Sequence, residues 1–172
     1  MANHQRLATL CASVSVPRTL CAIALGLGLL AADQPAGAQT DADKRTLAEL
    51  ALRWALDGGL ADVKLLKDPT VIVVAAMNLP KATELTVPNR KVVLASPLRI
   101  QGNADASGDF LYCVIGPFER KPDGVRVPIA LRWAVSVKHT GPPYLSGGGA
   151  ALHFRQQDGQ WRLDPVQEVW SS

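Results

Sequence analysis

The sequence of 172 residues has little of several things. It contains three cysteines and 5% aromatic residues, and its longest uncharged apolar run, residues 19–32, is shorter than the roughly 20 residues that span a bilayer as a helix. So few cysteines exclude a small protein held together by many disulfides. A hydrophobic content of 48% with 19% charged residues excludes a disordered chain and a collagen-like repeat. The composition instead indicates one ordinary globular domain.

The first 38 residues have the pattern of a cleaved export signal. Arg6 and Arg18 are their only arginines or lysines, the apolar run 19–32 follows, and the small residues AGA end at Ala38. Signal peptidase recognises small residues at this place, so cleavage is predicted between Ala38 and Gln39. An uncleaved anchor is the alternative. The protein is then predicted to be periplasmic or secreted, with no membrane span after processing.

Cleavage would change the charge and the cysteine count. Cys11 and Cys21 leave with two arginines and one aspartate, so the net charge falls from +3 to +2. Such a balanced chain favours neither nucleic acid nor an anionic membrane as a partner. Cys113 then stays alone in the apolar run 110–115, without a CxxC pattern, which favours a buried, inert thiol over a nucleophile.

An amphipathic helix is predicted over residues 41–56. Leu47, Leu50 and Trp54 recur at helical spacing, and the glycine pair at 58–59 ends the pattern. This apolar stripe must cover another apolar surface, most simply the face of a sheet.

Most of the remaining chain has strand character. Residues 70–76 (TVIVVAA) are β-branched, as in a strand buried on both faces. Residues 125–138 alternate apolar and polar side chains, which predicts one buried face and one partly wet face. Pro128 cannot donate to a neighbouring strand and therefore indicates an edge or a bulge. The other predicted elements are a short helix or turn at 60–67, strands at 91–94 and 98–100, a loop or short helix at 101–109, a strand at 110–118, a turn at 121–124 and a connection rich in proline and glycine at 139–149.

A hairpin is predicted at the end of the chain, with strands 150–157 and 160–169. Its turn is Asp158-Gly159, the preferred pair for a two-residue type I′ turn, and this turn fixes the register. On the apolar side, Phe154 meets Leu163 and Gln156 meets Trp161, and this side, which includes Leu152, should face the helix. On the other side, Arg155 meets Arg162 and His153 meets Asp164.

The order of these elements resembles a known superfamily. A leading helix, a strongly bent sheet and a terminal hairpin of the form GGGAALHFRQQDGQWRLDPV are similar to the nuclear transport factor 2-like α+β cone folds. The resemblance covers residues 41–170 and implies an α+β fold, with an N-terminal helix packed on a strongly curved antiparallel sheet, in a single domain of residues 39–172. A cystatin-like sheet around one helix is the rival topology. Because the superfamily holds isomerases, dehydratases and polyketide cyclases as well as binding domains, and no catalytic motif matches, the resemblance implies a pocket without a reaction.

Four residues are predicted to contact a ligand or partner. Tyr144 and Leu145 lie in the connection at 139–149, where a partner can reach them. Tyr112 and His153 are the other two. The pairing of His153 with Asp164 suits either an oriented imidazole for general-base chemistry or, as the register favours, an ion pair on the polar face.

Other patterns give less specific signals. Residues 147–149 (GGG) lead into a strand and lack a following GK[ST], which favours a bulge over phosphate binding. Asp105 and Asp109 lack the remaining ligands of a calcium loop, and no histidine or cysteine spacing fits zinc, so no metal or cofactor is predicted. Basic side chains gather on one strand face and suit either an anionic ligand or a solvated surface: Arg126, Arg132, Lys138, Arg155 and Arg162.

These observations favour an exported, non-enzymatic binding or interaction module. It would hold a small apolar ligand in the cone or bind an envelope protein. The alternative is a small lyase or isomerase with an acid or base in the cone, for which Tyr112, Asp109 and His153 are the candidates. A homodimer formed through the outer sheet face is the third class.

Export can be tested at the N-terminus. If the signal is cleaved as predicted, Edman sequencing of the protein from a periplasmic extract begins at Gln39. Recovery of the chain in the membrane fraction with Met1 intact would contradict the cleavage.

Overall fold

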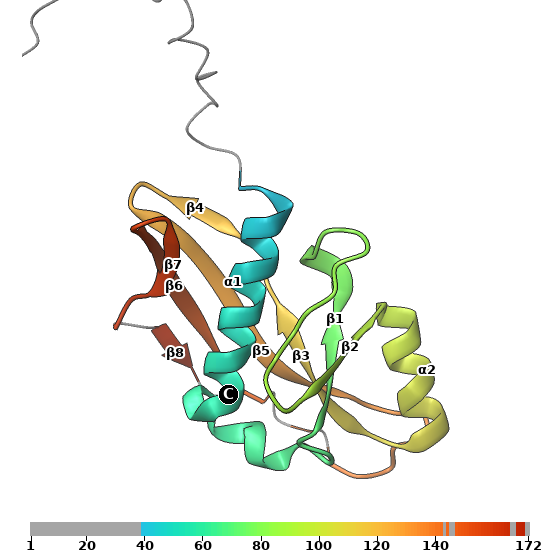
Figure 1. Cartoon of the computed structure of the whole chain (residues 1–172). Coiled ribbons are helices and arrows are strands. Elements are labelled where there is room, and N and C mark those ends of the chain that lie inside the picture. The colour runs from blue at the N-terminus through green and yellow to red at the C-terminus, as the bar shows by residue number, and fades with distance from the viewer. Residues whose placement is uncertain (1–38, 143, 145–146, 166–167, 171–172) are drawn as a thin grey trace, which may run out of the picture. The chain divides into compact units, whose positions relative to one another are not determined.

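The computed structural model describes residues 39–142, 144, 147–165 and 168–170, and Figure 1 shows their arrangement. The N-terminal helix α1 (Asp41–Trp54) packs on a mixed sheet that curls through 203° into a half-barrel. The predicted α+β class and strong sheet curvature are confirmed. The other elements are a π-helical turn (Ala55–Gly59), 3-10 helices at Ala61–Leu65 and Ala76–Asn78, helix α2 (Pro97–Ser107), and strands β1 (Val71–Ala75), β2 (Lys91–Ala95), β3 (Phe110–Ile115), β4 (Glu119–Lys121), β5 (Gly124–Ala134), β6 (Gly149–Gln157), β7 (Gln160–Leu163) and β8 (Glu168–Trp170).

The two ends of α1 are set by local chemistry. At its start the Thr40 hydroxyl accepts a hydrogen bond from the Asp43 amide at 3.0 Å, and the Asp43 carboxylate accepts one from the Thr40 amide at 3.1 Å. This capping box satisfies two amides that have no partner within the helix. At its end the chain makes a π-helical turn in which Gly58 has φ +106°, a conformation that favours glycine.

The predicted helix is confirmed, but its buried stripe is rotated from the predicted one. Leu50 and Trp54, expected at the centre of the contact with the sheet, lie partly buried at its margin. Alanines take the centre because small side chains let the helix approach the sheet closely. The fully buried residues of α1 are Leu47, Ala48, Ala51 and Leu52.

The sheet is mixed, whereas the sequence predicts an antiparallel one. Its strands follow the order β2-β1-β3-β5-β6-β7, with β4 paired to β5 and β8 paired to β6. All pairs from β3 onward are antiparallel, but β1 runs parallel to both β2 and β3. Parallel strands of one sheet need a crossover connection, and α2 supplies the one that carries the chain from β2 past β1 to β3.

Helix α2 replaces the strand predicted at residues 98–100. The Ser96 hydroxyl accepts a hydrogen bond from the Arg99 amide at 3.3 Å, and Pro97 occupies the first turn, where its missing N–H costs nothing. A short apolar segment fits helix and strand alike, so the pattern of these three residues is misleading. In the described part of the chain no helix is long and apolar enough to cross a membrane.

The two helices cover opposite faces of the sheet. Ile72 and Val74 of β1 belong to the main core with α1, while the intervening Val73 and the following Ala75 pack in a second cluster with α2. Alternate residues of a strand point to opposite faces, so β1 is covered on both sides, as predicted. On β5 the α1 face holds a run of buried residues: Val125, Val127, Ile129 and Leu131.

Strand β5 ends at Ala134, four residues before the predicted end. The chain leaves the sheet because two aspartates bind its next amides: Ser136 N–H donates to Asp109 at 2.7 Å and Val137 N–H to Asp105 at 2.8 Å. Ser136 is consequently buried and Val137 is 79% exposed, the reverse of what the alternation predicts.

Pro128 lies at an interruption of the sheet, as expected of a residue without an N–H. On one side of β5, pairing with β3 ends at Ile129 and pairing with β4 begins at Arg126. Pro128 occupies the gap, where its carbonyl accepts a hydrogen bond from Gly116 at 2.7 Å.

The predicted hairpin register is confirmed as far as Leu163, where β7 ends six residues before the predicted end of the strand, and β8 then pairs with β6 in another register. Phe154 pairs with Leu163 and Gln156 with Trp161, and both turn residues have positive φ, 51° at Asp158 and 75° at Gly159. The apolar side does face the helix, because the Trp161 indole N–H donates to the Asp43 carboxylate of α1 at 2.8 Å.

The contact between α1 and the sheet can be tested with one substitution. Leu52→Ala removes a fully buried side chain and should lower the free energy of unfolding by about 2–5 kcal/mol in urea denaturation. Leu98→Ala is the matched control, because Leu98 is 86% exposed on α2, and it should change stability by less than about 0.5 kcal/mol. Equal effects of the two substitutions would contradict the described core.

Candidate ligand-binding site

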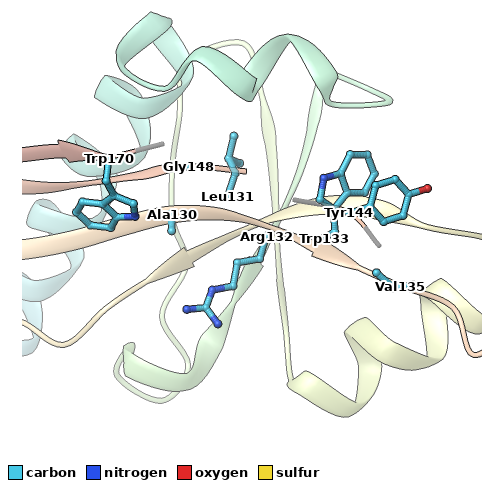
Figure 2. A pocket seen from close by; sticks show the side chains of 8 residues that line it. All are labelled: Ala130, Leu131, Arg132, Trp133, Val135, Tyr144, Gly148 and Trp170. Carbon is cyan, nitrogen blue, oxygen red and sulfur yellow. The ribbon is translucent and has the colours of Figure 1, made fainter. Parts of the chain in front are cut away.

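A cavity of about 300 Å³ lies where β6 separates from β5. The last paired residues are Ala130 and Gly149, and the Leu131 amide still donates to the Gly148 carbonyl at 3.1 Å. Beyond this point the cavity follows the edge of β5, as Figure 2 shows. We call it the β5 pocket; its lining residues are Ala130, Leu131, Arg132, Trp133, Val135, Tyr144, Gly148 and Trp170.

Two stacked aromatic rings form one end of the β5 pocket. The rings of Trp133 and Tyr144 are nearly parallel, with centroids 4.2 Å apart and 14° between their planes. Tyr144 is 40% exposed, so the stack keeps an accessible apolar surface. Figure 2 shows both rings together at one end of the pocket.

Trp170 lies at the opposite end of the pocket in Figure 2, and a glycine makes room for it. A Cβ atom on Gly149 would lie 2.6 Å from the Trp170 ring, closer than atoms approach without a shift. The ring therefore lies directly on the β6 backbone. A Cβ atom on Gly147 would likewise lie 3.0 Å from Cβ of Leu131. These two close approaches explain why the GGG run contains glycines, without a role in phosphate binding.

Arg132 gives the β5 pocket a positive charge. Its side chain extends to the side of β5 opposite Leu131, and it is exposed. Within the described ranges no ion pair or side-chain hydrogen bond involves its guanidinium group. Two other members of the predicted basic face are neutralised: Arg126 lies 3.1 Å from Glu119 and 3.2 Å from Glu168, and Arg155 lies 2.9 Å from Asp164.

Asp109 organises the loop that carries Tyr144. Because Phe110 pairs with Ala134, Asp109 lies beside the residues that follow β5. One of its carboxylate oxygens accepts from the Ser136 amide at 2.7 Å, and the other contacts Nδ1 of His139 at 2.6 Å. The Tyr144 hydroxyl is also hydrogen-bonded to this carboxyl. These donors, Ser136 first, lower the pKa of Asp109, while the bond to Asp109 raises the pKa of Tyr144.

Both ring nitrogens of His139 face oxygen acceptors. Nδ1 lies 2.6 Å from Asp109 and Nε2 lies 3.1 Å from the Pro142 carbonyl. The Pro142 carbonyl and then Asp109 raise the pKa of His139, because both stabilise the protonated ring. An imidazole with both nitrogens engaged as donors has no free lone pair for a general base.

The structure brings together only part of the predicted site. Tyr144 lines the β5 pocket, and Tyr112 lies opposite Arg132 on β3 but packs with Phe110 against the second core cluster. Leu145 lies outside the described residues. His153 lies opposite Arg126, on the paired part of β5, and its Nε2 is 3.7 Å from Glu168.

Sequence reasoning misses His139, Trp133 and Trp170 as site residues. The sequence pattern places Trp133 in a strand and His139 in a loop without giving either a role. The one available signal is that His139, like Tyr144, lies in the connection at 139–149, where function is commonly found.

A second, larger hollow of about 530 Å³ lies between the end of α1 and the terminal hairpin. Trp54 forms one wall and lies against Gly59, where an added Cβ would be 2.5 Å from the indole ring. Arg53 and Asp57 are its charged members, and both are exposed. We call it the α1 groove; its apolar lining consists of Leu50, Trp54, Phe154 and Leu163.

Neither cavity contains Cys113, which is fully buried in the main core. Burial raises the pKa of its thiol to about 12, so the thiolate that nucleophilic chemistry requires is not formed at neutral pH. Among the described residues, no group of three or more histidine, cysteine, aspartate or glutamate side chains is arranged to hold a metal ion.

Cys113 should therefore resist alkylation. In the folded protein at neutral pH, iodoacetamide is expected to leave the peptide that contains Cys113 unmodified, as read by mass spectrometry, and to modify it fully in guanidinium chloride. Rapid modification of this peptide in the folded protein would show that the thiol is accessible.

No protein-family model, curated protein or solved structure matches this chain. The function is therefore argued from the geometry of its own cavities.

Proposed function

We propose that this protein is an exported, non-enzymatic binding module whose β5 pocket takes a small ligand with an anionic group and a flat apolar part. The observation that carries the proposal is that two kinds of residue line one cavity at the edge of β5: Arg132, which has no charged partner among the described residues, and the Trp133 and Tyr144 stack. The N-terminal signal pattern supports export. The helix on a curved sheet supports a relationship to the nuclear transport factor 2-like superfamily.

The chemistry of the lining selects this ligand class. Arginine binds carboxylate, sulfonate or phosphate groups through several donors in a fixed plane. Aromatic side chains bind flat apolar groups with little loss of side-chain freedom. A volume of about 300 Å³ lies at the lower end of the range for small-molecule pockets.

A binding role fits this site better than acid–base catalysis. Of the three residues named for an enzyme, only Asp109 lies in the network next to the β5 pocket, and its carboxylate oxygens accept hydrogen bonds from Ser136, His139 and Tyr144. A carboxylate occupied in this way holds a loop in place rather than accepting a proton from a substrate.

The α1 groove supports a second ligand class, which is wholly apolar. The sequence predicts a small apolar ligand in the cone, and the α1 groove lies at the margin of the core between the end of α1 and the hairpin. Its larger volume and its four apolar side chains favour an uncharged ligand, since its charged residues lie exposed.

Two fluorescent probes that differ by one sulfonate group can test the proposal. 8-Anilinonaphthalene-1-sulfonate has the anionic group and N-phenyl-1-naphthylamine lacks it. We expect Arg132→Gln to weaken binding of the sulfonate probe about tenfold, because a charge-assisted hydrogen bond is lost, and to leave the uncharged probe unaffected. Fluorescence titration measures both dissociation constants.

Matched variants identify the cavity that each probe occupies. Arg162→Gln removes an exposed arginine outside both cavities and should change neither affinity. Tyr144→Ala should weaken the sulfonate probe, and Leu50→Lys should weaken the uncharged probe if that probe occupies the α1 groove. The proposal fails if Arg132→Gln and Arg162→Gln have the same effect on the sulfonate probe.

A further inference from the structure

We infer that the charge state of His139 sets the position of Tyr144 and so regulates the β5 pocket. The coupling between the charge of His139 and the position of Tyr144 is a property of the protein without any ligand. Only its effect on ligand affinity rests on the proposed function.

The number of hydrogens on the imidazole ring decides which of its two contacts can be hydrogen bonds. A neutral imidazole carries one N–H, whereas both nitrogens of His139 lie within hydrogen-bond distance of an oxygen that can only accept. The geometry is thus complete only when the ring is protonated. In the neutral ring one nitrogen lone pair would face an oxygen lone pair, and the two oxygens would compete for the single N–H. The Pro142 carbonyl is the weaker acceptor of the two, because Asp109 carries a full negative charge.

The loop is built around this ring. A Cβ atom on Gly141 would lie 3.0 Å from Cε1 of His139, so the backbone passes directly over the imidazole before Pro142 accepts its hydrogen bond. Tyr144 follows two residues later, with its ring centroid 5.0 Å from that of His139. Loss of the hydrogen bond between His139 and the Pro142 carbonyl therefore changes the backbone two residues before Tyr144, whose ring stacks on Trp133.

The charged groups around His139 are of both signs, and the one in direct contact, Asp109, favours the protonated ring. Asp109, at the start of β3, contacts it directly, and Asp105 of α2 holds the preceding Val137 amide. Lys138 is the adjacent cation, and the Tyr144 hydroxyl shares the Asp109 carboxylate. Arg132 is the cation of the pocket itself.

The pKa shifts of His139 and Asp109 give the direction of the pH effect. The pKa of His139 is raised above its ordinary 6.5, so its contribution to the folded loop is complete below that pH and is lost as pH rises through the raised pKa. The pKa of Asp109 is lowered from 3.8, so its contribution is present above that pH and is lost as pH falls through the lowered pKa. The contact is therefore complete in mildly acidic solution and opens on the alkaline side.

The coupling can be measured without a ligand. We expect the near-ultraviolet circular dichroism of the protein to change in one step with rising pH, at the midpoint at which His139 titrates by NMR. Trp133→Phe should remove most of this step, because it removes the indole that stacks on Tyr144. His139→Gln, which cannot titrate, should abolish it.

Two further variants test whether a different titrating group causes the step. His153→Gln removes the other described histidine, which faces Glu168, and should leave the step intact. Asp109→Asn retains the shape of the side chain but removes the charge, so it should move the midpoint to lower pH. A step that persists in His139→Gln, or that disappears in His153→Gln, overturns the inference.

The sulfonate probe then separates this inference from the proposed function. Its affinity should fall at least about fivefold as the pH rises through the midpoint, and should be independent of pH in His139→Gln. A circular dichroism step without any probe binding would contradict the proposed function alone. Binding that requires Arg132 but does not change with pH, in a protein that shows no such step, would contradict the regulation alone.

Discussion

The burial of α1 against the curled sheet is the contact on which the rest of the structure depends. Its alanines bring the helix backbone close to the sheet, and the hairpin is tied to the same helix through Trp161 and Asp43. Apolar side chains from β1, β3, β5 and β6 fill the space between them. An open cone could have held a ligand at its centre. Because α1 occupies that space, the two cavities lie at the margins of the core.

The position of each cavity follows from where packing or pairing stops. At the β5 pocket, pairing between β5 and β6 stops at Gly149, the first residue of β6, while β5 continues beyond Ala130 to Ala134. At the α1 groove, the π-helical turn takes the chain away from the hairpin after Trp54. Glycines 59 and 149 lie at these two points, and at each the backbone lies against an indole ring. Both cavities are thus built from a tryptophan and a glycine that admits it.

Local patterns in the sequence predict the hairpin turn and the extent of the first helix. Asp158-Gly159 gives the hairpin register because a two-residue turn fixes its own strands, and the apolar period gives α1. The parallel pairing of β1 depends on contacts between distant segments, which no local pattern encodes. The same limit applies to the site. Asp109 and His139 meet only because Phe110 pairs with Ala134, and β4 lies between β3 and β5 in the chain, so turn geometry cannot give that register.

The core and the loop are held by different forces, and this difference separates stability from regulation. Leu47, Leu52 and their neighbours are held by burial, which does not respond to pH near neutrality. The described loop residues 136–142 and 144 are held by the carboxylates of Asp105 and Asp109 and by the imidazole of His139 at the rim of the sheet. Protons can therefore rearrange the loop while the core stays folded. Since the loop carries Tyr144 and the strand beneath it carries Arg132 and Trp133, a change in one histidine reaches the pocket without passing through the core.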